Sequence, residues 1–159
     1  MTHSRSLPAR SRLRALAALA LAGLAAPLLA APADQIRVRT TGYRDLGAAF
    51  KAINDGLRAP SPQPAVLRAA AQRIRNAATQ QYNWYPAGSG PRPGLKTAAK
   101  PEIWTQGARF RQLQDGFAVQ SAALERAVST GNTAAIRTAA RSLGGSCKAC
   151  HDQFRAEAN

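Results

Sequence analysis

The chain's two cysteines, Cys147 and Cys150, lie three residues apart near the C-terminus, and His151 directly follows the second. Two thiols and an imidazole in the order C-x-x-C-H are typical of c-type haem attachment, in which the thiols add to the haem vinyl groups and the imidazole ligates the iron. On a helix, spacings of three and four place the three side chains on one side, within about one turn. The motif therefore predicts one covalently bound haem c with His151 as an axial ligand of the iron.

Three other interpretations use the same residues. A disulfide suits an exported protein, but it leaves His151 without a role and closes a loop too short to constrain the chain strongly. A thioredoxin-like redox pair belongs to a βαβ setting, which the sequence does not indicate. A structural zinc site needs four ligands, and after residue 33 the chain offers only these two cysteines and one histidine. Haem attachment is the interpretation that uses all three residues.

Residues 1–33 are predicted to be a cleavable signal peptide. Four arginines precede an apolar run, and Ala31-Pro32-Ala33 forms a small-residue cleavage site before Asp34. The run of about 16 residues is shorter than the roughly 20 residues of a membrane-spanning helix. We therefore expect a periplasmic protein with no membrane association after cleavage, in which residues 34–159 form a single haem-binding domain.

The chain is strongly basic. It carries 22 Lys+Arg residues against 8 Asp+Glu residues, and the predicted signal peptide removes only four arginines. Such an excess of positive charge favours acidic partners, including an acidic redox protein. The charges are scattered along the chain and form no basic stripe, so no nucleic-acid partner is expected.

Four helical segments are predicted. Two Pro/Gly-rich stretches, residues 60–64 and 86–94, and a shorter break at residues 129–132 separate segments rich in Ala, Leu, Arg and Gln. Apolar residues recur at spacings of three, four and seven, which gives one apolar stripe per helix. In the first segment the stripe consists of Ile36, Tyr43, Leu46, Phe50, Ile53 and Leu57. Short breaks between such helices favour an all-α fold, an antiparallel up-down-up-down four-helix bundle.

The helix boundaries can also be predicted. Pro101 suits the first turn of a third helix that runs to Val128. Asn132 or Thr133 is expected to cap the fourth helix. The connection over about residues 83–100 is long enough to cross one end of the bundle.

The composition restricts the second axial ligand of the iron. Met1 is the only methionine and His3 the only other histidine, and both leave with the predicted signal peptide. Neither Met/His nor bis-His ligation is then available within one chain. We expect the sixth position to be open, or taken by water, a lysine or a tyrosine. An open ferrous iron can bind small gases.

The chain after the signal peptide resembles the cytochrome c' family of exported four-helix-bundle haem proteins. The stretches CKACHDQFR, the preceding GGSC, LKTAAKPEIW and RTTGYRDLG carry the resemblance. It implies that Cys147 and Cys150 hold the haem and that His151 is the proximal ligand. It also implies a five-coordinate iron that binds NO and CO, and a homodimer formed through the first two helices.

The resemblance implies roles for three residues outside the motif. Arg39 would pair with a haem propionate, Tyr43 would lie above the sixth position, and Arg155 would lie beside the proximal face. Each has an alternative: Arg39 as an ordinary exposed arginine, Tyr43 as a core tyrosine, and Arg155 as a last-turn cation complementing the helix dipole. Three aromatic residues beside the long connection could cover a haem edge, form an interface or fix the loop: Tyr82, Trp84 and Tyr85.

The leading prediction for function is a gas-binding haem protein, and the alternative is an electron carrier between exported redox partners. The vacant sixth position favours gas binding. An enzyme is not expected, because a peroxidase-like site would lack its distal histidine, and a tyrosine such as Tyr43, with an ordinary pKa of about 10, is a poor proton acceptor at neutral pH.

Overall fold

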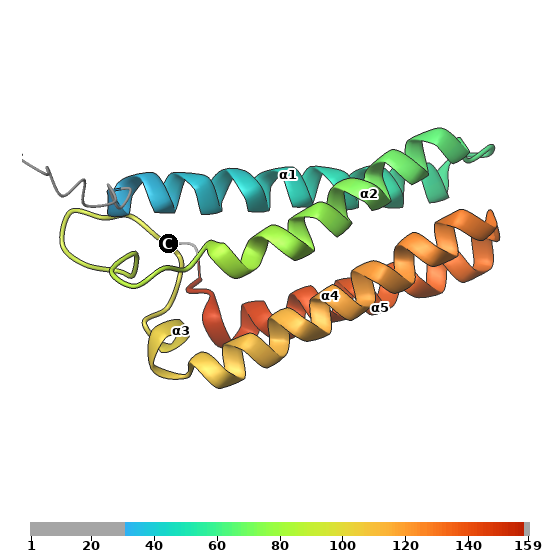
Figure 1. Cartoon of the computed structure of the whole chain (residues 1–159). Coiled ribbons are helices and arrows are strands. Elements are labelled where there is room, and N and C mark those ends of the chain that lie inside the picture. The colour runs from blue at the N-terminus through green and yellow to red at the C-terminus, as the bar shows by residue number, and fades with distance from the viewer. Residues whose placement is uncertain (1–30, 158–159) are drawn as a thin grey trace, which may run out of the picture.

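The computed structural model describes residues 31–157, which form helices joined by short turns and one long connection (Figure 1). Four long helices alternate in direction, so the predicted all-α, up-down-up-down four-helix bundle is confirmed. The elements in chain order are α1 (Pro32–Arg58), α2 (Pro64–Gln80), the 3-10 turn η1 (Gln81–Asn83), α3 (Glu102–Thr105), α4 (Gly107–Thr130) and α5 (Thr133–Phe154).

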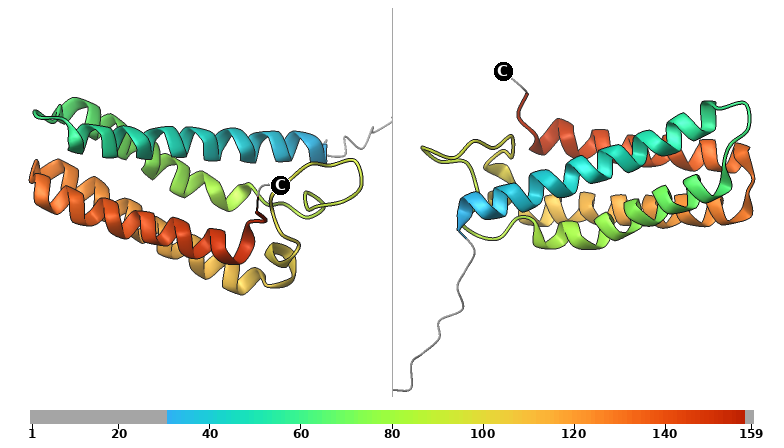
Figure 2. Two further views of the ribbon diagram at one scale, coloured as in Figure 1. Left: turned by 180° about the vertical axis from the view of Figure 1, so that it is seen from behind. Right: turned by 90° about the horizontal axis from the view of Figure 1, so that it is seen from above.

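The helices do not pack equally around the bundle. α1 packs along α2, α2 along α4, and α4 along α5, whereas α1 and α5 contact each other only sparsely. The α1–α2 and α4–α5 turns lie together at one end, and the connection between η1 and α4 crosses the other end (Figures 1 and 2). The bundle is therefore closely packed on three sides, and its fourth side, between α1 and α5, has room for a site.

The main hydrophobic core fills the half of the bundle nearest the two turns. Its large members include Ile53, Leu57, Leu67, Ile74, Phe117, Leu124, Val128, Ile136 and Leu143. From the predicted stripe of α1, Ile53 and Leu57 are buried, whereas Tyr43, Leu46 and Phe50 are only partly buried because they border a cavity. The first half of the stripe thus lines the cavity, and the second half packs in the core.

The third predicted helix is interrupted, so the prediction of one continuous helix to Val128 was wrong. Pro101 is the N-cap of the short α3, and Gln106, with φ −115° and ψ 41°, separates α3 from α4. α4 then begins at Gly107, a weak helix former. Ile103 of α3 and Phe110 of α4, on the two sides of the break, belong to one small cluster with Phe154.

The predicted cap of the last helix is confirmed. The Asn132 side-chain oxygen accepts a hydrogen bond from the Ala135 N–H at 3.0 Å. Gly131 ends α4 with a φ of 70°, a left-handed conformation that glycine adopts without a steric penalty. Together these two residues turn the chain sharply from α4 into α5.

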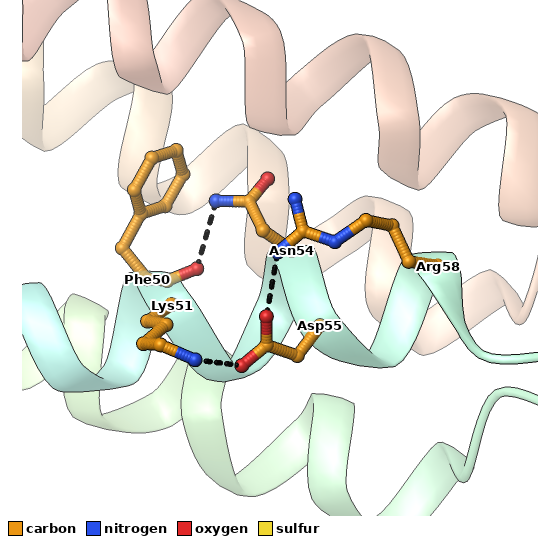
Figure 3. A network of polar contacts seen from close by, with 5 residues as sticks. All are labelled: Phe50, Lys51, Asn54, Asp55 and Arg58. Carbon is orange, nitrogen blue, oxygen red and sulfur yellow. Dashed lines mark hydrogen bonds and ion pairs between the residues drawn. The ribbon is translucent and has the colours of Figure 1, made fainter.

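The last turns of α1 carry a small polar network (Figure 3). Asp55 accepts hydrogen bonds from Lys51 and Arg58 at 2.5 and 2.6 Å, and these two cations lower the pKa of its carboxyl group. The Phe50 ring extends from the same helix towards α5, where a Cβ atom added to Gly144 would lie 3.5 Å from its Cζ atom. Phe50 therefore lies against α5 and forms part of the wall of a cavity.

Residues 1–30, which carry most of the predicted signal peptide, lie outside the described residues. Of the helices found within residues 31–157, none combines the length and the apolar character needed to cross a membrane.

Candidate functional site

A cavity of about 540 Å³ lies between α1 and α5 at the end of the bundle that the long connection crosses. Its volume is within the range of about 300–1,000 Å³ that is usual for cofactor and ligand sites. Large apolar side chains dominate its walls: Leu46, Phe50, Tyr85, Ile103, Phe110, Leu113, Phe117, Leu143 and Phe154. The size and lining suit a large hydrophobic cofactor.

The three residues of the C-x-x-C-H motif line this cavity together. Cys147, Cys150 and His151 all project from α5 into its wall, which confirms the prediction that they share one side of a helix. Both cysteines are free thiols and partly buried. Burial raises the pKa of Cys147, and burial together with the neighbouring Cys147 raises the pKa of Cys150 to about 11. Both groups are therefore protonated thiols at neutral pH.

His151 stands at the mouth of the cavity and is exposed. Partial burial, followed by the positive charge of Arg155, lowers the pKa of the imidazole. The ring is therefore neutral near pH 7, and a neutral imidazole keeps the nitrogen lone pair that a metal ion requires.

Arg155 follows α5 and is held by a short antiparallel pairing with the long connection. The Lys100 N–H donates to the Phe154 carbonyl at 3.0 Å, and the Ala156 N–H donates to the Ala98 carbonyl at 2.8 Å. Arg155 is thus the C-cap residue of α5, in an extended conformation directly after the last helical turn. The pairing fixes Arg155 beside His151 and places residues 97–99 in the cavity wall.

Arg39 enters the cavity wall from α1 and is buried, with 4% of its surface exposed. One terminal nitrogen, Nη1, donates to the Trp84 carbonyl at 3.2 Å and to the Ser89 hydroxyl at 3.3 Å. The other, Nη2, donates to the Ser89 carbonyl at 3.0 Å and to the Thr97 hydroxyl at 3.1 Å. The alternative of an ordinary exposed arginine was therefore wrong: Arg39 clamps the long connection onto α1.

The Arg39 charge has no carboxylate partner among residues 31–157; the ion pairs found there use other residues. Its guanidinium lies over the Tyr85 ring, 4.7 Å from the ring centre. Burial lowers the pKa of Arg39, and the nearby phenols of Tyr85 and Tyr43 act in the opposite direction. Buried cations are normally paired with an anion. An unpaired one in a cavity wall suits a cofactor that carries negative groups, so the cavity fits a haem with its propionates.

Tyr43 lines the cavity from α1, one helical turn after Arg39. Its ring makes an edge-on contact with Trp84, with ring centres 4.7 Å apart, and its hydroxyl accepts a hydrogen bond from the Tyr85 hydroxyl at 3.2 Å. Burial, followed by the neighbouring Tyr85, raises the pKa of Tyr43 well above its ordinary value. Tyr43 is therefore a neutral phenol facing the same space as the α5 motif.

The three aromatic residues whose roles the sequence left open have different locations in the structure. Tyr85 lines the cavity. Trp84 is buried, with 4% exposed, and fixes the connection against α1. Tyr82 lies outside the cavity lining and donates a hydrogen bond to Asp115 at 2.8 Å.

Two buried glutamines in the cavity wall were not predicted. The Gln81 side-chain amide donates to the Gln114 carbonyl at 3.2 Å, and the Gln114 amide donates to the Gln81 carbonyl at 3.1 Å. This reciprocal pair ties the end of α2 to α4. Gln114 occupies an apolar-stripe position between Phe110 and Phe117, and a polar residue on such a stripe is a signal for a buried hydrogen-bonded side chain.

Replacing Gly42 by alanine is expected to lower the free energy of unfolding by about 1–3 kcal/mol, the usual cost of overpacking. The new Cβ atom would lie 2.3–2.9 Å from three atoms of the Trp84 ring, so the ring must leave its place against α1. Thermal unfolding followed by circular dichroism measures the effect. Gly116→Ala is the matched control, because a Cβ atom there meets nothing within 4 Å and helix propensity alone would favour alanine. Equal stability of the two variants would contradict the packing of Trp84 on Gly42.

A four-helix bundle whose last helix presents C-x-x-C-H to a large apolar cavity is the arrangement of a helical c-type haem protein. The family model for Cytochrome C' matches residues 34–155. A cytochrome c' of Rubrivivax gelatinosus is 32% identical over 125 residues, which cover 78% of this chain and 95% of the relative. The chain therefore belongs to the cytochrome c' family, and it is a haem c protein.

Solved structures agree with this assignment. A cytochrome c' described as having an unusual ligand-controlled dimer dissociation superposes with a TM-score of 0.75 and 28% identity, covering 80% of this chain and 98% of that one. The nitric oxide complex of a cytochrome c' variant from Alcaligenes xylosoxidans superposes with a TM-score of 0.74 and 26% identity, covering 82% and 99%.

Proposed function

We propose that the cavity holds one haem c, joined to the chain through Cys147 and Cys150 and ligated on its proximal side by His151. The observation that carries this proposal is that one cavity collects both thiols, a neutral imidazole and a buried cation without a carboxylate partner. The haem iron would supply ligand binding and one-electron chemistry. The chain supplies two thiols for attachment and a basic nitrogen at the mouth of the cavity.

Two arginines are assigned to the haem: Arg39 would contact a propionate, and Arg155 would lie beside the proximal face. Arg39 carries an unneutralised charge in the cavity wall, and its Nε–H is the one donor not used by the long connection. We assign it to a haem propionate, with which it would form a charge-assisted contact. Arg155 acts electrostatically on His151 and is assigned to the proximal face.

We propose that the sixth position of the iron is open to small gases, with Tyr43 above it. Among the described residues that line the cavity there is no lysine, no methionine and no second histidine. Tyr43 keeps its phenol proton because burial raises its pKa, and a neutral phenol is a poor iron ligand. The nitric oxide complex of the Alcaligenes xylosoxidans relative supports NO as the class of ligand, with CO as its laboratory substitute.

A periplasmic electron carrier is the second candidate. His151 and Arg155 are exposed at the mouth of the cavity, so the edge of a haem held there would be within reach of a partner protein. The net positive charge would favour an acidic redox partner. No catalytic residue is assigned, because the lining within residues 31–157 offers no second histidine to act as a distal acid–base group.

The remaining assignments concern export and assembly. Residues 1–33 are proposed to be a signal peptide that directs the chain to the periplasm and is cleaved there, leaving residues 34–159 as the haem domain. The relative with ligand-controlled dimer dissociation supports a homodimer formed through the first two helices. No membrane contact and no nucleic-acid partner are proposed.

The absorption spectrum of the exported, haem-loaded protein tests this function. We expect the reduced protein to show a broad high-spin Soret band that sharpens and shifts when CO is added, because the sixth position is open. A sharp low-spin reduced spectrum that CO does not change would contradict the open site and favour electron transfer. Absence of bound haem would contradict the cofactor assignment itself.

A further inference from the structure

Two tyrosine hydroxyls meet inside the cavity. Tyr43 comes from α1 and Tyr85 from the long connection, and the Tyr85 hydroxyl donates to the Tyr43 oxygen at 3.2 Å. Two hydroxyls carry two protons, and only one lies between the two oxygens. Among residues 31–157, no protein group accepts the second proton, which stays on Tyr43. The pair therefore offers one free O–H donor to whatever lies beside it in the cavity.

The two rings are held in place by their neighbours. The Tyr85 ring makes edge-on contacts with Phe110 and Trp104, with ring centres 4.8 and 6.0 Å apart, and Arg39 lies over it. The Tyr43 ring in turn makes an edge-on contact with Trp84. Rings fixed in this way keep their hydroxyls at defined positions. The packing of the cavity wall therefore maintains the hydrogen bond between Tyr43 and Tyr85.

Both phenols are neutral donors at physiological pH. Burial raises the pKa of Tyr43 and also that of Tyr85. A hydroxyl that accepts one hydrogen bond becomes a stronger donor of its own proton, because hydrogen bonds in a chain polarise one another. By donating to Tyr43, Tyr85 both fixes the Tyr43 hydroxyl and strengthens it as a donor.

Hydrogen-bond donors beside the open position of a haem influence which ligand it retains. We infer that Tyr85 is a positioning residue that acts through Tyr43, so that the site retains ligands with a hydrogen-bond-accepting outer atom, such as NO, in preference to CO. CO has a weakly accepting oxygen and gains less from the donor. This inference rests on the proposed open haem site. It adds that a hydrogen bond from the Tyr43 hydroxyl decides which ligand the site retains.

Tyr85→Phe in the haem-loaded protein tests the inference. It removes only the hydroxyl and keeps the ring contacts that hold the connection. We expect NO to dissociate from the reduced variant about two- to tenfold faster, as expected for the loss or weakening of one hydrogen bond, with CO dissociation much less affected. The C–O stretching frequency of the CO complex is expected to rise, since the donor near the ligand weakens.

Two further variants complete the experiment. Tyr43→Phe is expected to change both readouts in the same direction as Tyr85→Phe, and it tests the inference even where the latter folds poorly. Tyr82→Phe is the matched control, because its hydroxyl bonds to Asp115 outside the cavity lining. It is expected to leave both readouts unchanged.

Two results would overturn the inference alone. The first is that Tyr85→Phe keeps the wild-type NO dissociation rate and the wild-type C–O stretching frequency. The second is that NO and CO release accelerate equally, which would mean that the tyrosines act on bound ligands only by their bulk. A wild-type protein that binds haem but neither gas would overturn the proposed function, and the inference with it. The two failures are therefore distinguishable.

Discussion

Replacing Cys147 and Cys150 together by serine is expected to abolish covalent haem attachment almost completely. Both thiols line the cavity and are free, so they are available to add to the haem vinyl groups, which a serine hydroxyl does not replace. Extraction of the exported protein with acidified acetone measures the result. Haem should move into the organic phase from the double variant and stay with the wild-type protein.

The control for this experiment lies between the two cysteines. Lys148 is exposed and forms an ion pair with Asp152 at 2.6 Å on the outer face of α5. Lys148→Ala should therefore keep its haem through extraction, since an exposed ion pair contributes little to stability. Haem that resists extraction in the double serine variant would contradict attachment at these residues. Loss of haem from both variants would indicate a defect of α5 and not of the thiols.

The sequence predicted the parts of the site that depend on local spacing. The C-x-x-C-H residues lie on one helical turn, so their common face follows from helix geometry alone. The four long helices and the Asn132 cap likewise follow from periodicity and local hydrogen bonding. These features need no knowledge of how distant segments meet.

Features that depend on contacts between distant segments were not predictable in this way. The long connection has no periodicity, so the sequence could not decide which of its aromatic residues would face the cavity, as Tyr85 does, and which would pack on Gly42, as Trp84 does. The break at Gln106 was not predicted either, although Gly107, a weak helix former, stands directly after it.

One non-local feature did leave a signal in the sequence. Arg39 lies three residues after Ile36 and four before Tyr43, which places it on the apolar stripe of α1. A charged residue at such a position either interrupts the apolar stripe and destabilises the packing, or is a buried cation with specific hydrogen-bond acceptors. The four hydrogen bonds of Arg39 to the connection show that the second explanation holds.

Arg39→Met is expected to lower the free energy of unfolding by about 3 kcal/mol, because it leaves buried carbonyl groups without their donors. Methionine keeps much of the side-chain volume but donates nothing to the Trp84 and Ser89 carbonyls. The connection should then detach from α1, and trypsin should cleave it rapidly after Lys96, because the Arg92–Pro93 bond resists trypsin. Chemical unfolding and timed proteolysis of the haem-loaded protein measure the two effects.

Two comparisons make this result specific to the clamp. Arg37→Ala removes an arginine from the same helix that is 75% exposed and pairs only with Asp34, so stability and proteolysis should stay close to wild type. Arg39→Lys keeps the positive charge beside the cavity but lacks the planar fork that reaches both sides of the connection. It should remain sensitive to trypsin while supporting any charge contact with the haem. A lysine variant as resistant to trypsin as wild type would mean that charge, and not the hydrogen-bonded fork, holds the connection over the site.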